Sequence, residues 1–385
     1  MKHVIIIPDG AADLRITELS GKTPLQAAHL PFIDQLAKEG RCGGVQNVPE
    51  GMSPGSDVAI MSLVGYDPTG SYSGRAPLEA AAMDIKTGDK EWIFRCNLVE
   101  IRDGVMRDHS AGNISNEAAG KLIATLNNRL ADESIRFYPG VSYRNIMIIK
   151  GDMHVTTTPP HNILDQPCSP YLPKGEGAST LISLIEESRK LLKGFNESSA
   201  TSIWLWGEGK PTRLESFEHR FGIRGAVVTA VDLMRGIGKL IGWDVVNVPG
   251  ATGWYDTDYR AKGAAALRAL ANHDLACIHI EATDEAGHEG NFQQKITSLE
   301  RIDADIVGPV VHYLKSSYSE GWRVLLLPDH PTPCSVRTHT PDPVPYCLTG
   351  SNIESDDNES FSEALLEASP ISPIRGHELM GIFTS

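Results

Sequence analysis

The sequence predicts an α/β fold, in which a largely parallel sheet carries helices on both faces and a smaller α+β domain is inserted into the chain. The first observation is that short apolar runs typical of buried strands alternate with amphipathic helical segments. The second is that the middle of the chain departs from this alternation and contains several short strands, one helix and then proline-rich turns. The third is the length of 385 residues, which exceeds what a single hydrophobic core usually serves.

Each expected element has its own local signal. Pro31 suits the first position of a helix and Gly40 suits its end, so a helix is expected over Pro31–Glu39. Apolar residues four apart predict helices over Ile114–Leu130 and Leu181–Leu192, and Lys295–Leu314 is expected to be one long amphipathic helix. The strands expected from the alternating pattern are Val4–Ile7, Ser202–Leu205, Val245–Val248, Leu275–Ile280 and Val324–Leu327.

The inserted domain is predicted to cover residues 84–224, which leaves residues 1–83 and 225–385 as a discontinuous larger domain. Short strand-like runs at Trp92–Leu98, Val105–Arg107 and Tyr143–Ile149 favour this division. Motifs suited to metal binding lie on both sides of the insert. We therefore expect substrate to bind in the cleft between the two domains.

The composition limits the class of protein. A net charge of −14 argues against a nucleic-acid-binding face, which usually needs a basic stripe. The first apolar run is too short for a signal peptide, and no stretch approaches the roughly 20 apolar residues that cross a bilayer. The six cysteines show no paired spacing and are expected to be reduced thiols. Together these features predict a cytoplasmic protein that binds neither nucleic acid nor membrane.

Acidic residues and histidines follow three of the expected strands. In an α/β sheet of this kind, ligand sites form beyond the carboxyl ends of the strands, so we treat these side chains as one site. Three carboxylates and three histidines suit two divalent cations, and oxygen and imidazole ligands without thiolates favour Mn²⁺, Zn²⁺ or Mg²⁺. The candidate ligands are Asp9, Asp284, His288, Asp329, His330 and His339.

A Pro-Gly-Ser turn opens the apolar helix that begins near Ser56. Free backbone N–H groups and the positive end of the helix lie beside the hydroxyl at such a position. A serine there can act as a nucleophile when a metal ion stabilises its alkoxide. The alternative is that Ser56 only caps the helix. Ser53 and Ser62 are less suited to attack, because one precedes the turn and the other lies inside the helix.

Taken together and in order, these motifs resemble those of the cofactor-independent phosphoglycerate mutases of the archaeal type, within the alkaline phosphatase superfamily. The resemblance spans nearly the whole chain and implies an alkaline-phosphatase-like sheet domain. The segments that carry it are Pro8–Gly10, Gly21–Leu25, Pro54–Asp57, Gly65–Pro68, Gly74–Glu79, Pro249–Gly253, Asp284–His288, Pro328–His330 and Thr338–His339.

The resemblance implies a function and a role for each site residue. It implies interconversion of 3-phosphoglycerate and 2-phosphoglycerate through a phosphoserine at Ser56, without 2,3-bisphosphoglycerate and with Mn²⁺ as the typical metal. One metal would be held by Asp9, Ser56, Asp329 and His330, and the other by Asp284, His288 and His339. Lys262 falls where the family has a catalytic lysine, and the candidates for substrate binding are Arg75, His109 and Arg144.

Four segments of the insert resemble instead a bacterial branch of the family that has been proposed to include homoserine kinases. That activity would use the same serine and metals to move phosphate from ATP to homoserine. A phosphomonoesterase would need only water as the acceptor, and a metal-stabilised scaffold without activity would not need Ser56. The four segments are Phe94–Val99, Asp108–Gly112, Tyr143–Asn145 and Pro160–Ile163.

Overall fold

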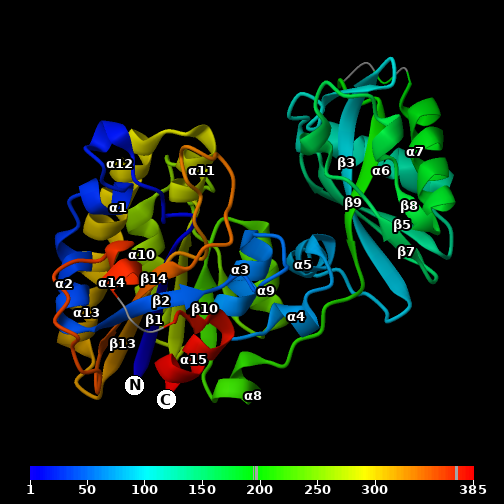
Figure 1. Ribbon diagram of the computed structural model, residues 1–385. Helices are drawn as coiled ribbons and strands as arrows, with labels where there is room; N and C mark the ends of the chain where they lie inside the picture. Colours follow the sequence, from blue (N-terminus) through cyan, green and yellow to red (C-terminus); the bar gives the residue numbers. More distant parts are fainter. Residues whose placement is uncertain (194, 196–197, 369–371) are drawn as a thin grey trace. The chain divides into compact units, whose positions relative to one another are not determined.

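The chain forms two compact units in the computed structural model, which describes residues 1–193, 195, 198–368 and 372–385 (Figure 1). The core unit comprises residues 1–72 and 214–385, and the inserted unit comprises residues 73–213. The predicted limits of 84 and 224 lie later in the chain than these. The difference arises because α5 (Arg75–Ala82) packs on β3 and β9 of the inserted unit, whereas the chain after Leu214 leads into α8 (Phe217–Phe221) of the core unit.

The core unit is built on a mixed sheet, which has eight strands among the described residues. The first five strands in the sheet are parallel, and β14 runs antiparallel to both of its neighbours. The largely parallel sheet expected from the sequence is therefore confirmed. In sheet order the strands are β11 (Asp244–Val246), β10 (Gly225–Val228), β12 (Leu275–Ile280), β1 (Lys2–Pro8), β13 (Trp322–Leu326), β14 (Val344–Gly350), β2 (Arg41–Gln46) and β15 (Ile374–Arg375).

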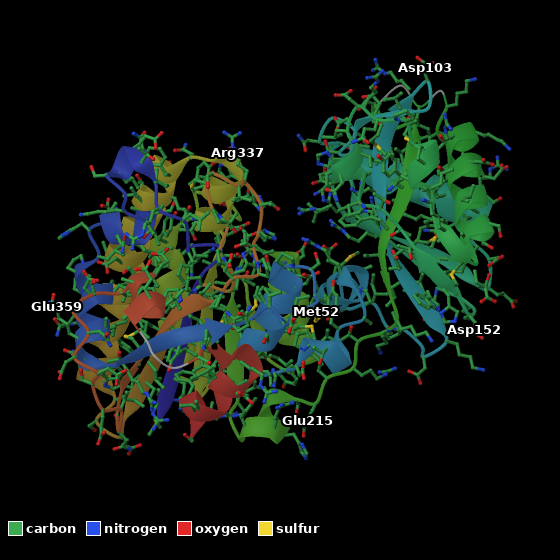
Figure 2. All side chains as sticks on the ribbon, viewed as in Figure 1. Met52, Asp103, Asp152, Glu215, Arg337 and Glu359 are labelled. Carbon is green, nitrogen blue, oxygen red and sulfur yellow. The ribbon has the colours of Figure 1, made fainter. Side chains whose placement is uncertain are left out.

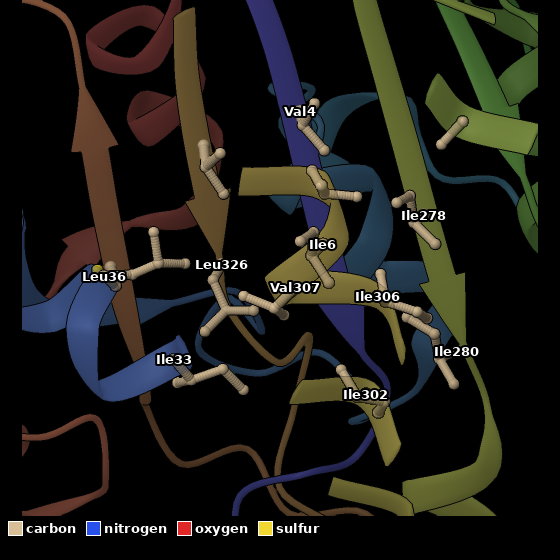
Figure 3. Packing of buried hydrophobic residues seen from close by; sticks show 14 of the residues in the cluster. Val4, Ile6, Ile33, Leu36, Ile278, Ile280, Ile302, Ile306, Val307 and Leu326 are labelled. Carbon is tan, nitrogen blue, oxygen red and sulfur yellow. The ribbon is translucent and has the colours of Figure 1, made fainter. Parts of the chain in front are cut away.

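Helices cover both faces of this sheet. On one face, Val4 and Ile6 of β1 pack with Ile33 and with residues of the helical segment that includes Ile306 (Figure 3). On the other face, Phe383 of α15 packs edge-on against His3. The helices of the core unit are α1 (Pro24–Ala27), α2 (Pro31–Glu39), α3 (Ser56–Leu63), α4 (Pro68–Ser71), α8, α9 (Asp232–Leu240), α10 (Tyr259–Ala269), α11 (Ala282–Glu289), α12 (Phe292–Ile302), α13 (Gly308–Ser317), α14 (Ala364–Ala368) and α15 (Gly376–Thr384), with a 3₁₀ turn at Thr17–Leu19.

The helix expected over Lys295–Leu314 is present within a continuous helical run from α12 to α13, but it is not α-helical throughout. A π-helical turn over Asp303–Val307 separates α12 from α13. Pro309, at the start of α13, has no N–H to donate to the preceding turn, so the α-helical hydrogen-bond pattern cannot continue through it. The turn also directs the Asp303 carboxylate to the backbone N–H of Ile33 at 2.7 Å, which caps α2.

The inserted unit consists of an antiparallel sheet with five strands in the part of the chain that the structure describes, together with three α-helices and a small hairpin. Helix α6 begins at Asn116, two residues later than expected, because the Ser115 side chain accepts from the Ala118 N–H and caps it there. The strands are β3 (Glu91–Arg102), β4 (Val105–Asp108), β5 (Ile135–Val141), β6 (Arg144–Lys150) and β9 (Ser202–Gly209), with β7 (His154–Thr156) and β8 (Lys174–Glu176) in the hairpin; the helices are α5, α6 (Asn116–Leu130) and α7 (Ala178–Leu192), with 3₁₀ turns at Pro160–Ile163 and Ser169–Tyr171.

The two ends of the inserted unit lie side by side. Ser73 Oγ donates to the backbone oxygen of Lys210 at 2.6 Å and lies 3.0 Å from the hydroxyl oxygen of Thr212. The chain therefore enters and leaves this unit at one place.

None of the described helices has the length and apolar character needed to cross a membrane. The six cysteines, all within the described residues, are free thiols, and five of them are buried. The expectation of reduced thiols matches this arrangement.

The stability of the core unit is expected to depend on His3 below pH 6.5. Burial, followed by the charge of Arg323, lowers the pKa of His3 to about 4. Because the unfolded chain takes up this proton more readily, the cost to folding is absent above pH 6.5 and grows as the pH falls toward 4. His3→Phe should therefore gain about 2 kcal/mol relative to the wild type between pH 7.5 and pH 5. Urea unfolding of both proteins at the two pH values measures this, and an equal difference at both would contradict it.

Candidate active site

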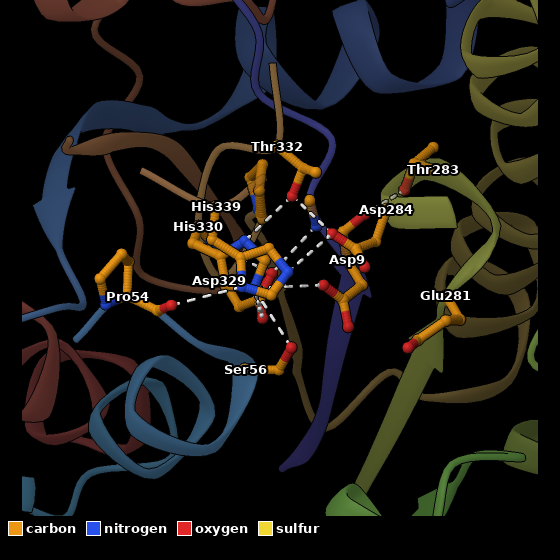
Figure 4. Close-up of polar contacts among 12 residues, drawn as sticks. Asp9, Pro54, Ser56, Glu281, Thr283, Asp284, Asp329, His330, Thr332 and His339 are labelled. Atoms are coloured by element: carbon orange, nitrogen blue, oxygen red, sulfur yellow. Dashed lines mark hydrogen bonds and ion pairs between the residues drawn. The ribbon is translucent and has the colours of Figure 1, made fainter. Parts of the chain in front are cut away.

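The predicted metal ligands come together at the carboxyl edge of the core sheet (Figure 4). Asp9 follows β1, Asp284 lies in the first turn of α11 after β12, and Asp329 follows β13. These three strands are neighbours in the sheet, so their carboxyl ends meet at one edge. Most of the side chains involved are almost completely buried.

Ser56 belongs to a first group of side chains, formed with Asp9, Asp329 and His330. The Ser56 hydroxyl oxygen lies 3.2 Å from His330 Nε2. The same nitrogen lies 3.2 Å from Asp329 Oδ2 and 3.7 Å from Asp9 Oδ1. The carboxylate and imidazole atoms of this group lie close enough to one another to surround a single ion.

Asp9 and Asp329 each have one oxygen fixed by protein donors and one left over. Asp9 Oδ2 contacts His279 Nε2 at 2.8 Å, while Asp329 Oδ1 accepts from the backbone N–H groups of Gly10 and His330 at 3.0 and 2.9 Å. The other two oxygens, Asp9 Oδ1 and Asp329 Oδ2, are buried and have no hydrogen-bond partner among the described residues. Buried acceptors without donors are costly, and a bound cation would satisfy both. The donor set therefore fits a divalent metal.

The second group contains Asp284, His288 and His339. His288 Nε2 lies 3.1 Å from Asp284 Oδ2, and His339 Nε2 lies 3.4 Å from Asp284 Oδ1. The two imidazole nitrogens are 2.9 Å apart. His330 also borders this group, because its ring lies 4.1 Å from that of His339.

All three histidines present Nε2 to the site because their Nδ1 atoms are engaged elsewhere. Nδ1 of His288 contacts the backbone oxygen of Arg337 at 3.1 Å, in the loop between β13 and β14 (Figure 2). Nδ1 of His339 contacts the backbone oxygen of Pro54 at 3.3 Å, and Nδ1 of His330 contacts the Thr332 hydroxyl at 3.3 Å. Partners of this kind fix the ring orientation and favour metal binding through the other nitrogen.

The pKa values of the two groups show how much negative charge is concentrated there. Burial raises the pKa of Asp9 well above its ordinary value, and the nearby carboxylate of Asp329 raises it further. Burial alone would also raise the pKa of Asp284, but hydrogen bonds from His288 and His339 outweigh it and hold that pKa well below the usual range. The hydrogen bond with Asp284 raises the pKa of His288 to about 9. The raised pKa of Asp9 shows that the first group is short of positive charge.

Ser56 is the first residue of α3, and Gly55 is the N-cap. The interpretation of Ser56 as merely the capping residue is therefore wrong. Its hydroxyl faces the site instead, at the positive end of an apolar helix (Figure 4). Gly10 allows the close approach on the opposite side: its φ is +61°, and a Cβ there would lie 2.5 Å from Asp284 Oδ1.

A buried ion pair holds two of the site's loops together. Lys295 Nζ lies 2.8 Å from Asp13 Oδ2, and both side chains are 0% exposed. The same ammonium group donates to the backbone oxygens of Ala12 at 3.3 Å and Thr332 at 2.9 Å. The segment after Asp9 and the segment after His330 are therefore joined through one lysine.

Lys262 is buried on α10, against the backbone of β12. Its Nζ donates to the backbone oxygen of His279 at 3.2 Å. Burial lowers the pKa of Lys262 to about 8, although the nearby Glu281 opposes the shift.

The three candidates for substrate binding lie in the inserted unit, in a cluster of positive charge. Arg75 contacts Glu79 at 3.1 Å, the His109 ring lies 5.6 Å from that of Tyr143, and the Arg144 guanidinium lies 5.8 Å from the same tyrosine ring. Burial would raise the pKa of Glu79, but the charges of Arg95, Arg75 and Arg144 hold it below its usual value. The three candidates therefore belong to one electrostatic neighbourhood.

Sequence reasoning missed two members of this cluster. Arg95 is almost fully buried, pairs with Glu79 at 2.9 Å and stacks on Trp206 at 4.2 Å. The His161 ring lies 5.3 Å from Trp206 and 6.1 Å from His109. Both residues lie in segments singled out in the sequence, Phe94–Val99 and Pro160–Ile163, and a cation or imidazole inside such a segment is the signal that would have identified them.

Known proteins resemble this chain over its whole length. A family model described as 2,3-bisphosphoglycerate-independent phosphoglycerate mutase matches residues 37–196. The protein of that name from Methanothrix thermoacetophila is 46% identical over 389 residues, covering 99% of this chain and 98% of the relative. A probable enzyme of the same name from Geobacter sulfurreducens is 43% identical over 395 residues, covering 99% and 98%.

Two solved structures share the fold. A Pyrococcus horikoshii protein superposes with a TM-score of 0.82 at 26% identity, covering 99% of this chain and 96% of that one. The cofactor-independent phosphoglycerate mutase of Thermoplasma acidophilum superposes with a TM-score of 0.67 at 24% identity, covering 100% and 99%. Both matches extend over the core unit and the inserted unit.

Proposed function

Because this chain belongs to the 2,3-bisphosphoglycerate-independent phosphoglycerate mutase family, we propose that it interconverts 3-phosphoglycerate and 2-phosphoglycerate through a phosphoserine at Ser56. The observation that carries the proposal is the Ser56 hydroxyl, which faces two carboxylates with free oxygens at the positive end of α3. Full-length relatives that bear the mutase name support the choice of substrate.

In this reaction Ser56 reacts as its alkoxide, and Oγ attacks the phosphorus atom of 3-phosphoglycerate. The new O–P bond forms as the bond from phosphorus to the C3 oxygen breaks, and the released oxygen takes up a proton. The C2 hydroxyl of the same glycerate then gives up its proton and attacks the phosphoserine, which restores Ser56 and yields 2-phosphoglycerate. No nucleotide, water or bisphosphoglycerate is consumed. Lys262 is the proposed proton carrier, since an amine with a pKa near 8 can release and regain a proton near neutral pH.

Divalent cations would be held in two places. We assign Asp9, Ser56, Asp329 and His330 to one ion, and Asp284, His288 and His339 to the other. When bound, the ions supply the positive charge that stabilises the serine alkoxide and the phosphoryl oxygens. Mn²⁺ is our first choice, with Zn²⁺ and Mg²⁺ as alternatives, because the ligands are oxygens and imidazoles without thiolates.

The proposed binding site for the carboxylate of the substrate is the positively charged cluster of the inserted unit. Arg75, His109 and Arg144 remain its candidate residues, and Arg95 and His161 join them. Within this cluster Glu79 is the acidic partner of Arg75 and Arg95. A small trianionic substrate such as phosphoglycerate suits this excess of guanidinium groups.

Arg144→Gln is expected to raise KM for 3-phosphoglycerate by about 10- to 100-fold with a smaller change in kcat. The reason is that one charge-assisted hydrogen bond to a carboxylate is worth about 1.5–3 kcal/mol. Steady-state kinetics measure both constants. Arg213→Gln is the matched control, because Arg213 lies in the same unit but pairs with Asp89 at an exposed position. Unchanged constants in Arg144→Gln would remove Arg144 from substrate binding.

A direct assay separates the mutase from its alternatives. The purified protein, loaded with Mn²⁺, should convert 3-phosphoglycerate to 2-phosphoglycerate without added ATP or 2,3-bisphosphoglycerate. Phosphorylation of homoserine by ATP without mutase turnover would overturn the proposal in favour of a kinase. Release of inorganic phosphate as the main product would instead indicate a phosphomonoesterase.

A further inference from the structure

We propose that His279 is a positioning residue for the metal centre, because it determines which oxygen of Asp9 faces the cation. His279 lies on β12 and was not among the predicted site residues. Its side chain is 1% exposed and contacts Asp9 rather than Ser56 or the second group. The inference rests on the proposed metal-dependent function.

The contacts run across three neighbouring strands. Ile278 of β12 pairs with Val228 at the end of β10, and His279 pairs with Ile7 of β1. His279 therefore lies between Thr229, which follows β10, and Asp9, which follows β1. Its Nδ1 lies 3.2 Å from the Thr229 hydroxyl oxygen, and its Nε2 lies 2.8 Å from Asp9 Oδ2.

The direction of these hydrogen bonds follows from their neighbours. Thr229 Oγ1 already accepts from the Val231 N–H at 3.1 Å, so its own proton is available for His279 Nδ1. Nε2 then carries the imidazole proton and donates it to Asp9. When a cation is bound at Oδ1 the Asp9 carboxylate is ionised, and the opposite tautomer would place a bare nitrogen against it at 2.8 Å, where neither atom has a proton to share. Glu281 Oε2, at 3.7 Å from the same nitrogen, is too far away to take this proton.

This arrangement fixes the Asp9 carboxylate as a whole. Two hydrogen bonds hold the backbone of Asp9. Its N–H donates to the backbone oxygen of Ile280 at 2.9 Å, and its backbone oxygen accepts from the Thr283 hydroxyl. With the backbone fixed and Oδ2 engaged by His279, the carboxylate cannot rotate freely. Oδ1 is then the oxygen left for a cation, and it is buried with no hydrogen-bond partner among the described residues.

The test is a calorimetric titration of the chelator-treated, full-length protein with Mn²⁺. His279→Leu removes the donor and should weaken the affinity of one site by about 10- to 100-fold, while two ions still bind at saturation. His279→Gln, which restores an N–H at similar reach, should remain within a few-fold of the wild type. Thr229→Val should also weaken the Mn²⁺ affinity of the same site, but by less than His279→Leu does. Cys277→Ala is the control, because Cys277 is buried on the same strand two residues earlier and faces the same side.

Each result has a definite meaning. Wild-type protein that binds no Mn²⁺ would contradict the metal centre itself, and with it the proposed function. If His279→Leu binds two ions and its affinity at each site equals that of the wild type, the positioning role is overturned but the metal centre is not. A loss of one whole equivalent in His279→Leu would also overturn it, because His279 would then be a ligand. If His279→Leu does not fold, Thr229→Val decides, and an affinity equal to that of Cys277→Ala would count against the proposal.

Discussion

Ser56→Ala should lower kcat for mutase turnover by at least about 10⁴-fold while leaving the fold intact. Alanine removes the oxygen that would attack phosphorus, and the two other serines of this segment are poorly placed to replace it: Ser62 is buried inside α3, and Ser53 precedes the helix. Asp9, Asp329 and His330 remain to hold a metal, so loss of activity should not require loss of the cation.

Two measurements make this result specific to Ser56. Phosphorus NMR or intact-mass analysis of the wild type with substrate should detect a phosphoserine, which should be missing in Ser56→Ala. Ser53→Ala is the control and should retain normal turnover, because its side chain is exposed in the loop before α3. Appreciable turnover by Ser56→Ala would remove Ser56 from the mechanism.

Lys295→Met should destabilise the protein by about 3–5 kcal/mol. The substitution keeps the length of the side chain but leaves the Asp13 carboxylate buried without its ammonium partner. It also removes the donor that the backbone oxygens of Ala12 and Thr332 share. Since these residues lie in the loops that follow Asp9 and His330, metal affinity should fall as well.

Chemical unfolding of the chelated proteins measures the loss of stability, and titration with Mn²⁺ measures the effect on the site. The control is Lys315→Met, because Lys315 pairs with Glu39 at 2.8 Å where both side chains are partly exposed to solvent. That pair should contribute no more than about 1 kcal/mol. A similar loss in both variants would mean that burial of the Asp13–Lys295 pair is unimportant.

The sequence allowed the clustering of the proposed metal ligands to be predicted, because the three carboxylates each lie just beyond an apolar run that is long enough to recognise. Asp9, Asp284 and Asp329 needed only the rule that parallel strands end at the same edge of the sheet. Local signals also located α2 and β12 to the residue. The π-helical turn inside the helix over Lys295–Leu314 was not predicted, since an apolar stripe has the same spacing whether or not Pro309 breaks the α-helical hydrogen bonds.

The contacts of His279 and Arg95 were beyond sequence reasoning for a different reason. Both residues lie inside strands, where a buried polar side chain has no local pattern that names its partner. The partner of His279 is separated from it by 270 positions and is fixed by strand pairing. In the same way, Arg95 stacks on Trp206 only because β3 and β9 are paired, which places the two residues opposite each other. Such contacts can be predicted only when it is known which strands are neighbours in the sheet and in what register they pair.

The adjacent ends of the inserted unit have an evolutionary consequence. Ser73 is hydrogen-bonded to Lys210, so the two ends of the inserted unit lie close together. The unit can therefore be inserted between two residues of the core unit in the way that a short turn would be. A gene segment encoding it can therefore be exchanged by recombination without pulling apart the strands on either side. Such a module is free to diverge in its arginines and histidines while the metal ligands of the host stay under separate selection. If the proposed phosphoserine chemistry is common to the family, its members can in this way acquire different acceptors.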